Sequence, residues 1–251
     1  MGSPATVTIV ADADALAETA ARLVVETARE AVRRHGRFTI ALAGGATPRE
    51  TYARLAAPPW RARVAWDRTW VFFGDERAAP PDHPESNYRM AHDALLAHVP
   101  VPPDQVIRMR GEAEDTDAAA AEYARHLAAV FATRRGALPR LDLVLLGLGV
   151  DGHTASLFPG SPVLKEVFRP VAAVHAAAAA IPQRLTLTFP VLNAAARVVF
   201  LVAGAEKAKV VKAVLADQAP LPAALVRPDD GELVWLLERA AAALLPGGGS
   251  R

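Results

Sequence analysis

Cysteine is absent from the 251-residue chain. This absence excludes disulfide frameworks, cysteine-ligated zinc, iron–sulfur clusters and thiol catalysis, and it fits a reducing, cytoplasmic location. Charge of one sign is not in excess either, since 28 basic and 27 acidic residues leave a net charge of +1. We therefore expect no overall field that attracts nucleic acid or an anionic membrane surface, so a local site has to hold any anion.

Aromatic residues make up only 6% of the sequence, although 52% of it is hydrophobic. Because alanine supplies most of the apolar excess, helices packed closely on a sheet are favoured over an aromatic-rich β-sandwich. Long apolar runs are also missing, since the alanine-rich stretch 171–181 is shorter than the roughly 20 residues that span a bilayer. We expect one α/β domain over residues 1–246 with no membrane partner, and a flexible tail over 247–251.

Apolar spacing and turn residues predict alternating strands and helices. Apolar side chains three and four residues apart indicate a helix over 14–35 that ends at Gly36, and further helices over 86–98 and 114–135. Short apolar runs predict strands over 38–42, 69–73, 141–146, 184–188 and 197–202. This order predicts a doubly wound, Rossmann-like, mostly parallel sheet with helices on both faces, in which 184–188 is a half-buried strand.

A glycine turn follows the first predicted strand. Gly44 and Gly45 place backbone N–H groups at a helix start, where the helix dipole favours an anion such as phosphate. Thr47 is predicted to be the N-cap, with Pro48 at the first helical position and Glu50 three residues after the cap. An ordinary strand-to-helix turn is the alternative. The loop has neither a Walker pattern nor G-x-G-x-x-G, so nucleotide binding is not implied.

Charged residues follow the strand predicted over 69–73. Arg77 can bind a carboxylate or phosphate with two hydrogen bonds, and Asp75 can hold sugar hydroxyls or orient a catalytic base. Solvated surface charge is the alternative for both residues. Asn87 is a further candidate for substrate binding, although helix capping by Ser86 or Asn87 explains the same residues.

The loop after the most apolar strand carries the main candidate for proton transfer. Its sequence is GLGVDGHT over residues 147–154, and its glycines permit unusual backbone angles and close approach of a substrate. His153 follows Asp151 by two residues, and imidazole suits proton transfer near neutral pH, so we predict a general base. A surface histidine is the alternative. Ser156 is expected at a helix start, in a capping or backbone-bonding role rather than as a nucleophile.

Two cations remain as candidate anion ligands. Arg184 begins a predicted strand and Lys207 follows another, although solvated charge explains each equally well when taken alone. The sequence has no G-x-S-x-G nucleophile elbow, no H-E-x-x-H zinc pair and no calcium loop, so we expect a water nucleophile with neither metal nor cofactor. Ligands of such folds bind beyond the carboxyl ends of the strands. The polar segments expected to converge there are 43–48, 74–77, 147–154 and 204–207.

Taken in order, these segments resemble the 6-phosphogluconolactonases, within the larger glucosamine-6-phosphate deaminase and ribose-phosphate isomerase-like fold group. The resemblance extends from about residue 5 to 245 and implies hydrolysis of 6-phospho-D-glucono-1,5-lactone to 6-phospho-D-gluconate, in the oxidative pentose phosphate pathway. Its matching stretches are 43–48, 74–77, 86–88, 147–160, 184–188 and 204–208. The family commonly has serine at the positions of Ala43 and Ala46, so we expect a shifted phosphate affinity.

The resemblance also implies how the site is divided. Asn87 is expected to contact the substrate, and the ligands of its 6-phosphate are expected to be Gly44, Gly45, Thr47, Arg184 and Lys207. His153, oriented by Asp151 or Asp75, is expected to take a proton from the attacking water. Arg77 or loop N–H groups would stabilise the oxyanion that develops on the lactone carbonyl.

Two other functions stay open. A sugar-phosphate deaminase or isomerase shares the Asp-Gly-His element, but resembling the deaminases would require a glutamate directly before Pro159-Gly160. Phe158 stands there, and a phenyl ring cannot move a proton, so this chemistry is disfavoured. A non-catalytic sugar-phosphate sensing domain is expected to carry a helix-turn-helix and a basic face, and neither is evident.

Overall fold

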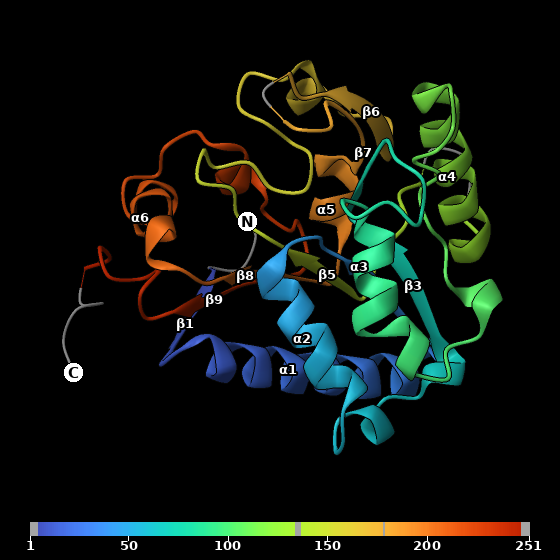
Figure 1. Cartoon of the computed structure of the whole chain (residues 1–251), viewed down its shortest axis with the longest axis horizontal. Coiled ribbons are helices and arrows are strands. Elements are labelled where there is room, and N and C mark those ends of the chain that lie inside the picture. Colours follow the sequence, from blue (N-terminus) through green and yellow to red (C-terminus); the bar gives the residue numbers. More distant parts are fainter. Residues whose placement is uncertain (1–4, 134–136, 178, 247–251) are drawn as a thin grey trace.

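A six-stranded parallel sheet forms the centre of the computed structural model (Figure 1). The structure describes residues 5–133, 137–177 and 179–246, and the tail predicted over 247–251 lies outside them. The strands, in their order across the sheet, are β1 (Thr6–Val10), β9 (Glu232–Glu238), β8 (Arg197–Val202), β5 (Leu143–Leu146), β2 (Phe38–Leu42) and β3 (Thr69–Phe73). Each neighbouring pair is parallel, as the sequence predicts.

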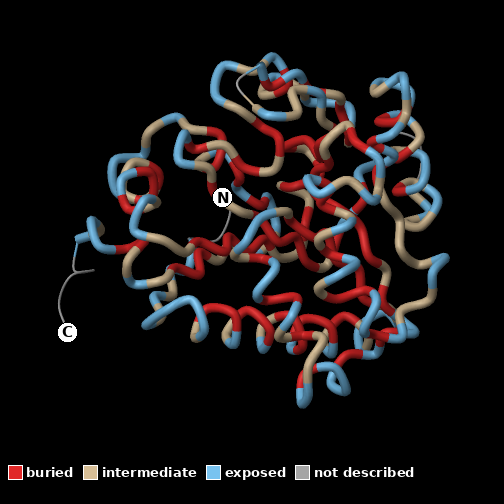
Figure 2. The backbone as a smooth tube through the Cα atoms, viewed as in Figure 1, coloured by how far each residue is buried: buried red, intermediate tan, exposed pale blue. Residues whose placement is uncertain are grey.

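Helices cover both faces of this sheet, which confirms the doubly wound α/β prediction. They are α1 (Ala13–His35), α2 (Ala46–Ala56), α3 (Asn87–Ala94), α4 (Thr116–Phe131), α5 (Phe189–Ala194) and α6 (Ala208–Leu215). The first three pack on the face that holds Ile40 and Val71, whereas α4 packs on the face of Phe72 and Val144 (Figure 1). Every residue of β2 and β5 is buried (Figure 2). Because successive residues of a strand point to opposite faces of the sheet, these central strands are buried on both sides.

A second sheet, three-stranded and antiparallel, was not predicted. Its strands, in order, are β4 (Asp75–Arg77), β7 (Gln183–Leu187) and β6 (Val171–His175). The strand predicted over 184–188 belongs to this sheet, and the expectation that it is half-buried was wrong. Its residues Leu185, Thr186 and Leu187 are fully buried, because β7 lies between two neighbours and packs against α4.

The predicted helices are present in the structure, but the ends of most of them differ from the prediction. The helix predicted over 14–35 agrees with α1 to within one residue, and Gly36 ends it with a left-handed φ of 82°. The helix predicted over 86–98 is shorter, because α3 gives way to a 3₁₀ turn at Leu96–His98. The helix predicted over 114–135 is α4, whose N-cap is Asp115. None of the described helices is both long enough and apolar enough to cross a membrane.

Helix α2 begins earlier than predicted, and Thr47 is not its N-cap. Gly45 is the N-cap, with a φ of 103°, and Ala46 is the first helical residue. A positive φ of this kind favours glycine and turns the chain directly from β2 into the helix, so Thr47 lies inside the first turn. No described side chain caps α2, which leaves its first N–H groups available to a ligand.

The strand order reverses between β2 and β5. From β2 the chain continues outward to β3, and it later returns to β5 on the other side and continues to β8. Open α/β sheets bind ligands in the crevice beyond the carboxyl ends of the strands at such a switch point. The loops that follow β2 and β5 meet there, since a Cβ at Gly147 would lie 3.9 Å from the backbone oxygen of Gly44.

Candidate active site

A pocket of about 340 Å³ opens at this switch point. It is lined by segments that follow β2, β5 and β8 and by residues of β4, which confirms the predicted convergence of the four polar segments. All of the predicted site residues except Asp151 line it. These are Gly44, Gly45, Thr47, Asp75, Arg77, Asn87, His153, Arg184 and Lys207.

His153 is oriented by the carboxylate of Asp151. Its Nδ1 lies 2.6 Å from Asp151 Oδ1, and its backbone N–H donates to the same oxygen at 3.1 Å. Burial by itself would raise the pKa of Asp151, but hydrogen bonds from the backbone and ring of His153 outweigh it and hold the pKa below its ordinary value. The carboxylate therefore stays charged beside the imidazole. No described residue bonds Nε2, so this nitrogen is the one that can take a proton in the pocket.

Gly149 provides the space in which this pair forms. A Cβ at Gly149 would lie 2.1 Å from His153 Nδ1 and 2.6 Å from Asp151 Oδ1. The loop also folds back on itself, because the N–H of Gly149 donates to the backbone oxygen of His153 at 2.8 Å and that of Gly152 to Gly149 at 3.0 Å. Gly152 has a left-handed φ of 86°. Gly149 and Gly152 are therefore required for steric reasons.

Phe158 packs against the imidazole of His153. The two ring centroids are 4.5 Å apart, with the planes tilted by 34°. The guanidinium of Arg184 lies 5.6 Å from the centroid of the same phenyl ring, within the range of a cation–π contact. A carboxylate at this place would be next to the imidazole, whereas the phenyl ring offers an apolar surface with no proton to transfer.

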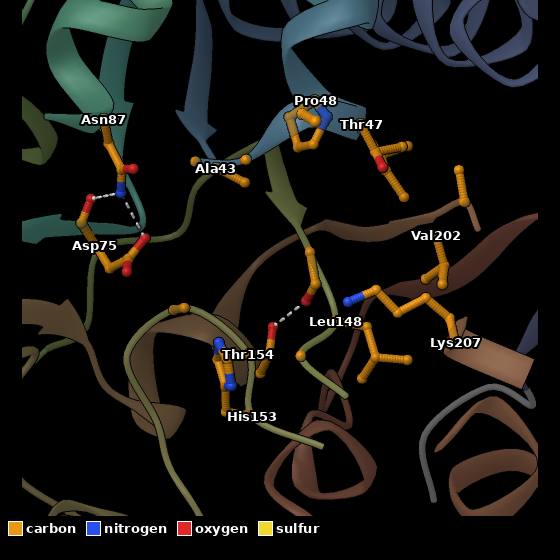
Figure 3. Close-up of a pocket in the computed structure, with 18 of the residues that line it drawn as sticks. Ala43, Thr47, Pro48, Asp75, Asn87, Leu148, His153, Thr154, Val202 and Lys207 are labelled. Atoms are coloured by element: carbon orange, nitrogen blue, oxygen red, sulfur yellow. Dashed lines mark hydrogen bonds between the residues drawn. The ribbon is translucent and has the colours of Figure 1, made fainter. Parts of the chain in front are cut away.

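Asp75 belongs to a buried network and not to the His153 pair. Asn87 Nδ2 donates to Asp75 Oδ1 at 3.0 Å and to its backbone oxygen at 2.9 Å (Figure 3). Ser156 Oγ donates to Asp75 Oδ2 at 2.7 Å. The expectation of a helix start at Ser156 was wrong, because the preceding Ala155 takes a φ of 47° and the chain continues in turns. The serine hydroxyl accordingly bonds a carboxylate instead of backbone.

Two guanidinium groups enter the pocket from neighbouring strands. Arg77 and Arg184 are direct partners in the β4–β7 pairing. Arg77 Nη1 donates to the backbone oxygen of Glu85, and Arg184 Nε donates to that of Ile181 at 3.1 Å. Burial lowers the pKa of Arg184, and the charge of Asp75 partly offsets this effect. Positive charge is thus held beside the carboxylate network.

The glycine loop after β2 is held by the buried phenol of Tyr52. This hydroxyl accepts the N–H of Ala43 at 2.8 Å and donates to its backbone oxygen at 2.9 Å. Tyr123 makes the same two bonds with Phe73 at the end of β3, at 2.8 Å and 3.1 Å. Each phenol therefore satisfies backbone groups where a strand leaves the sheet, which steadies the loop that follows.

Lys207 reaches into the pocket from the side opposite Asp75 and Asn87 (Figure 3). Glu206 beside it also lines the pocket and was not predicted as a site residue, although it lies within the predicted polar segment 204–207. Glu76 does not line the pocket, but it is only 2% exposed, although a glutamate in a charged segment is expected to lie in solvent. Within the described part of the chain, no three His, Asp or Glu side chains are grouped so that they could hold a metal ion.

Known proteins resemble this chain in sequence and in fold. Residues 11–235 match the family model described as glucosamine-6-phosphate isomerases/6-phosphogluconolactonase. The chain is 39% identical to 6-phosphogluconolactonase of Nostoc sp. over 96% of its own length and 98% of that protein. It is 40% identical to the Homo sapiens 6-phosphogluconolactonase, with 97% and 95% covered. The structure of 6-phosphogluconolactonase from Trypanosoma cruzi matches it with a TM-score of 0.87 and 30% identity, covering 98% of each chain. The chain therefore belongs to the glucosamine-6-phosphate isomerase and 6-phosphogluconolactonase family.

Proposed function

We propose that this chain hydrolyses 6-phospho-D-glucono-1,5-lactone to 6-phospho-D-gluconate, with His153 as the base that activates water. One observation carries the proposal. The imidazole of His153, whose Nδ1 is bonded to Asp151 at 2.6 Å, lines a pocket that also contains anion-binding groups. Relatives that are 39% and 40% identical over nearly the whole chain bear the name of this activity. A cytoplasmic location and the absence of a nucleic-acid partner remain predictions from composition.

The substrate phosphate is proposed to bind at the start of α2. Uncapped N–H groups and the positive end of the helix dipole favour an anion there. Lys207 extends toward the same pocket and adds a full charge (Figure 3). Because Ala43 and Ala46 offer no hydroxyl, backbone donors, Thr47 and the two cations have to bind the phosphate. The proposed phosphate ligands are Gly44, Gly45, Thr47, Arg184 and Lys207.

The chemical step follows from the orientation of His153. Nε2 takes a proton from water as the water oxygen bonds to the lactone carbonyl carbon, and Asp151 stabilises the imidazolium that forms. Arg77 stabilises the oxyanion on the former carbonyl. The intermediate then collapses, the bond from carbon 1 to the ring oxygen breaks, and the imidazolium returns its proton to that oxygen. Asp75 and Asn87 are proposed to hold sugar hydroxyls.

The demands of this reaction match what one base can supply. An activated lactone already hydrolyses slowly in water, and general-base catalysis contributes about 10²–10⁴-fold. Deamination or isomerisation would need a further proton-transfer group, and Phe158 is the residue that packs on the imidazole. A sensing domain would bind the sugar phosphate without accelerating any reaction.

Freshly generated 6-phospholactone provides the test. We expect the protein to accelerate 6-phosphogluconate formation over the spontaneous rate and to release no ammonia from glucosamine 6-phosphate. His153→Ala should lower kcat by roughly 10²–10⁴-fold with little change in KM. Lys207→Ala should chiefly raise KM. A wild-type rate equal to the spontaneous rate would refute the proposed function. Equal changes of kcat and KM in both variants would refute the assignment of catalysis to His153 and of binding to Lys207.

A further inference from the structure

Glu76 is a buried carboxylate whose two oxygens are fully used. Oε1 accepts the backbone N–H of Arg77 at 2.8 Å and of Asn87 at 2.7 Å. Oε2 accepts the backbone N–H of Tyr88 at 2.8 Å and the hydroxyl of Ser86 at 3.0 Å. Burial raises the pKa of Glu76, while the three backbone N–H bonds oppose this effect. Glu76 does not line the pocket, so neither direct catalysis nor solvation explains why a charge is buried here.

The bonds of Glu76 hold the first turn of α3 against β4, and Asn87 begins that turn. From this place the amide of Asn87 reaches Asp75 at 3.0 Å. It also packs directly on the glycine loop, since a Cβ at Gly44 would lie 1.9 Å from Asn87 Oδ1. One side chain, placed by Glu76, therefore joins β4 to the proposed phosphate loop.

The same network continues toward the proposed base. Asp75 Oδ2 accepts the hydroxyl of Ser156 at 2.7 Å, and the backbone N–H of Ser156 donates to Thr186 Oγ1 at 3.2 Å. Ser156 lies three residues after His153, so its position limits where the catalytic loop can lie. The glycine loop, through Asn87, and the His153 loop, through Ser156, are thus both tied to β4 by different oxygens of Asp75.

We propose that Glu76 is a positioning residue for the lactone hydrolysis proposed above, because it sets the separation between the phosphate loop and the His153 loop. A displacement of about 1 Å between a bound substrate and a catalytic group can cost 10²-fold in rate. Glu76→Gln keeps the size of the side chain but replaces one acceptor by an NH₂ group. That group would face the donors that now bind one carboxylate oxygen, so about half of the attachment is lost.

The test compares Glu76→Gln with Glu166→Gln. Glu166 is the matched control, because its carboxylate also accepts two backbone N–H groups, from Phe168 at 2.8 Å and Arg169 at 2.9 Å, but it does not line or contact the pocket. In folded protein, verified by near-ultraviolet circular dichroism, Glu76→Gln should lower kcat/KM by roughly ten- to a hundredfold. Glu166→Gln should leave it within about twofold. Equal kcat/KM values for wild type and Glu76→Gln would overturn the proposal.

A double-mutant cycle separates positioning from a general structural role. If Glu76 acts through Asn87, then Glu76→Gln together with Asn87→Ala should be no worse than the more damaging single variant, whereas multiplying effects would overturn the proposal. Should Glu76→Gln not fold, Ser86→Ala removes one of its bonds and should cost about two- to tenfold in kcat/KM. If the wild type shows no lactonase activity, the proposed function is refuted. The positioning role is then tested by calorimetric binding of 6-phosphogluconate, which should be weaker in Glu76→Gln than in the wild type.

Discussion

Replacing Gly149 by alanine should disable His153 without disturbing substrate binding. The backbone of Gly149 does not take a left-handed φ, so alanine carries no left-handed backbone penalty at this position. The new Cβ would lie 2.1 Å from His153 Nδ1, and ordinary contact begins at 3.4 Å, so the imidazole has to withdraw by the difference, 1.3 Å. The same methyl group would lie 2.6 Å from Asp151 Oδ1 and push the orienting carboxylate away as well.

A shift of this size has a large expected cost. Displacing a catalytic group by about 1 Å can lower the rate by 10²-fold, so kcat of Gly149→Ala should fall by roughly that factor. The proposed phosphate ligands lie on other loops, so KM should change by less than about threefold.

Steady-state hydrolysis of fresh 6-phospholactone measures both constants, and near-ultraviolet circular dichroism checks the fold. Gly74→Ala is the matched control, because Gly74 also has no left-handed φ and the nearest atom to its Cβ, the Leu42 backbone oxygen, is 3.5 Å away. Its kcat should stay close to that of the wild type. If Gly149→Ala retains a kcat within about threefold of the wild type, the paired imidazole is not the base and the reasoning is refuted.

Two further predictions concern stability. Tyr52→Phe leaves the buried N–H and carbonyl of Ala43 without their partner, so the free energy of unfolding measured in urea should fall by about 1–3 kcal/mol and KM should rise as the phosphate loop loosens. Tyr123→Phe should cost similar stability with KM unchanged, and equal KM values in the two variants would contradict this. Bonds from the Arg169 and Phe168 N–H groups lower the pKa of Glu166 from 4.5 to about 2. Its stabilisation is therefore complete above about pH 4.5 and lost as the pH falls toward 2, so the melting temperatures of wild type and Glu166→Gln should converge over that range; a constant difference would contradict the assignment.

Sequence patterns were sufficient to predict an element where the residues of that segment and its near neighbours in sequence determine its structure. Apolar runs located β2, β3 and β8, and helical spacing located α1. The run Thr6–Val10 has the β-branched residues of a strand and could have been recognised as β1. In contrast, the charged Asp75–Arg77 and the alanine-rich Val171–His175 carry no strand signal, and only their pairing with β7 makes them strands. The N-cap of α2 was misplaced because a glycine, and no side chain, starts that helix.

The sequence by itself determined the fold class, the glycine loops and the candidacy of His153, because each depends on residues close together along the chain. Only the tertiary structure decided between Asp151 and Asp75 as the partner of the imidazole. Asp75 is bonded to Ser156, 81 residues away in sequence, and Glu76 is buried by the start of α3. Composition and spacing cannot show which distant donors reach a carboxylate, and these donors determine whether it orients a base, holds a loop or lies in solvent.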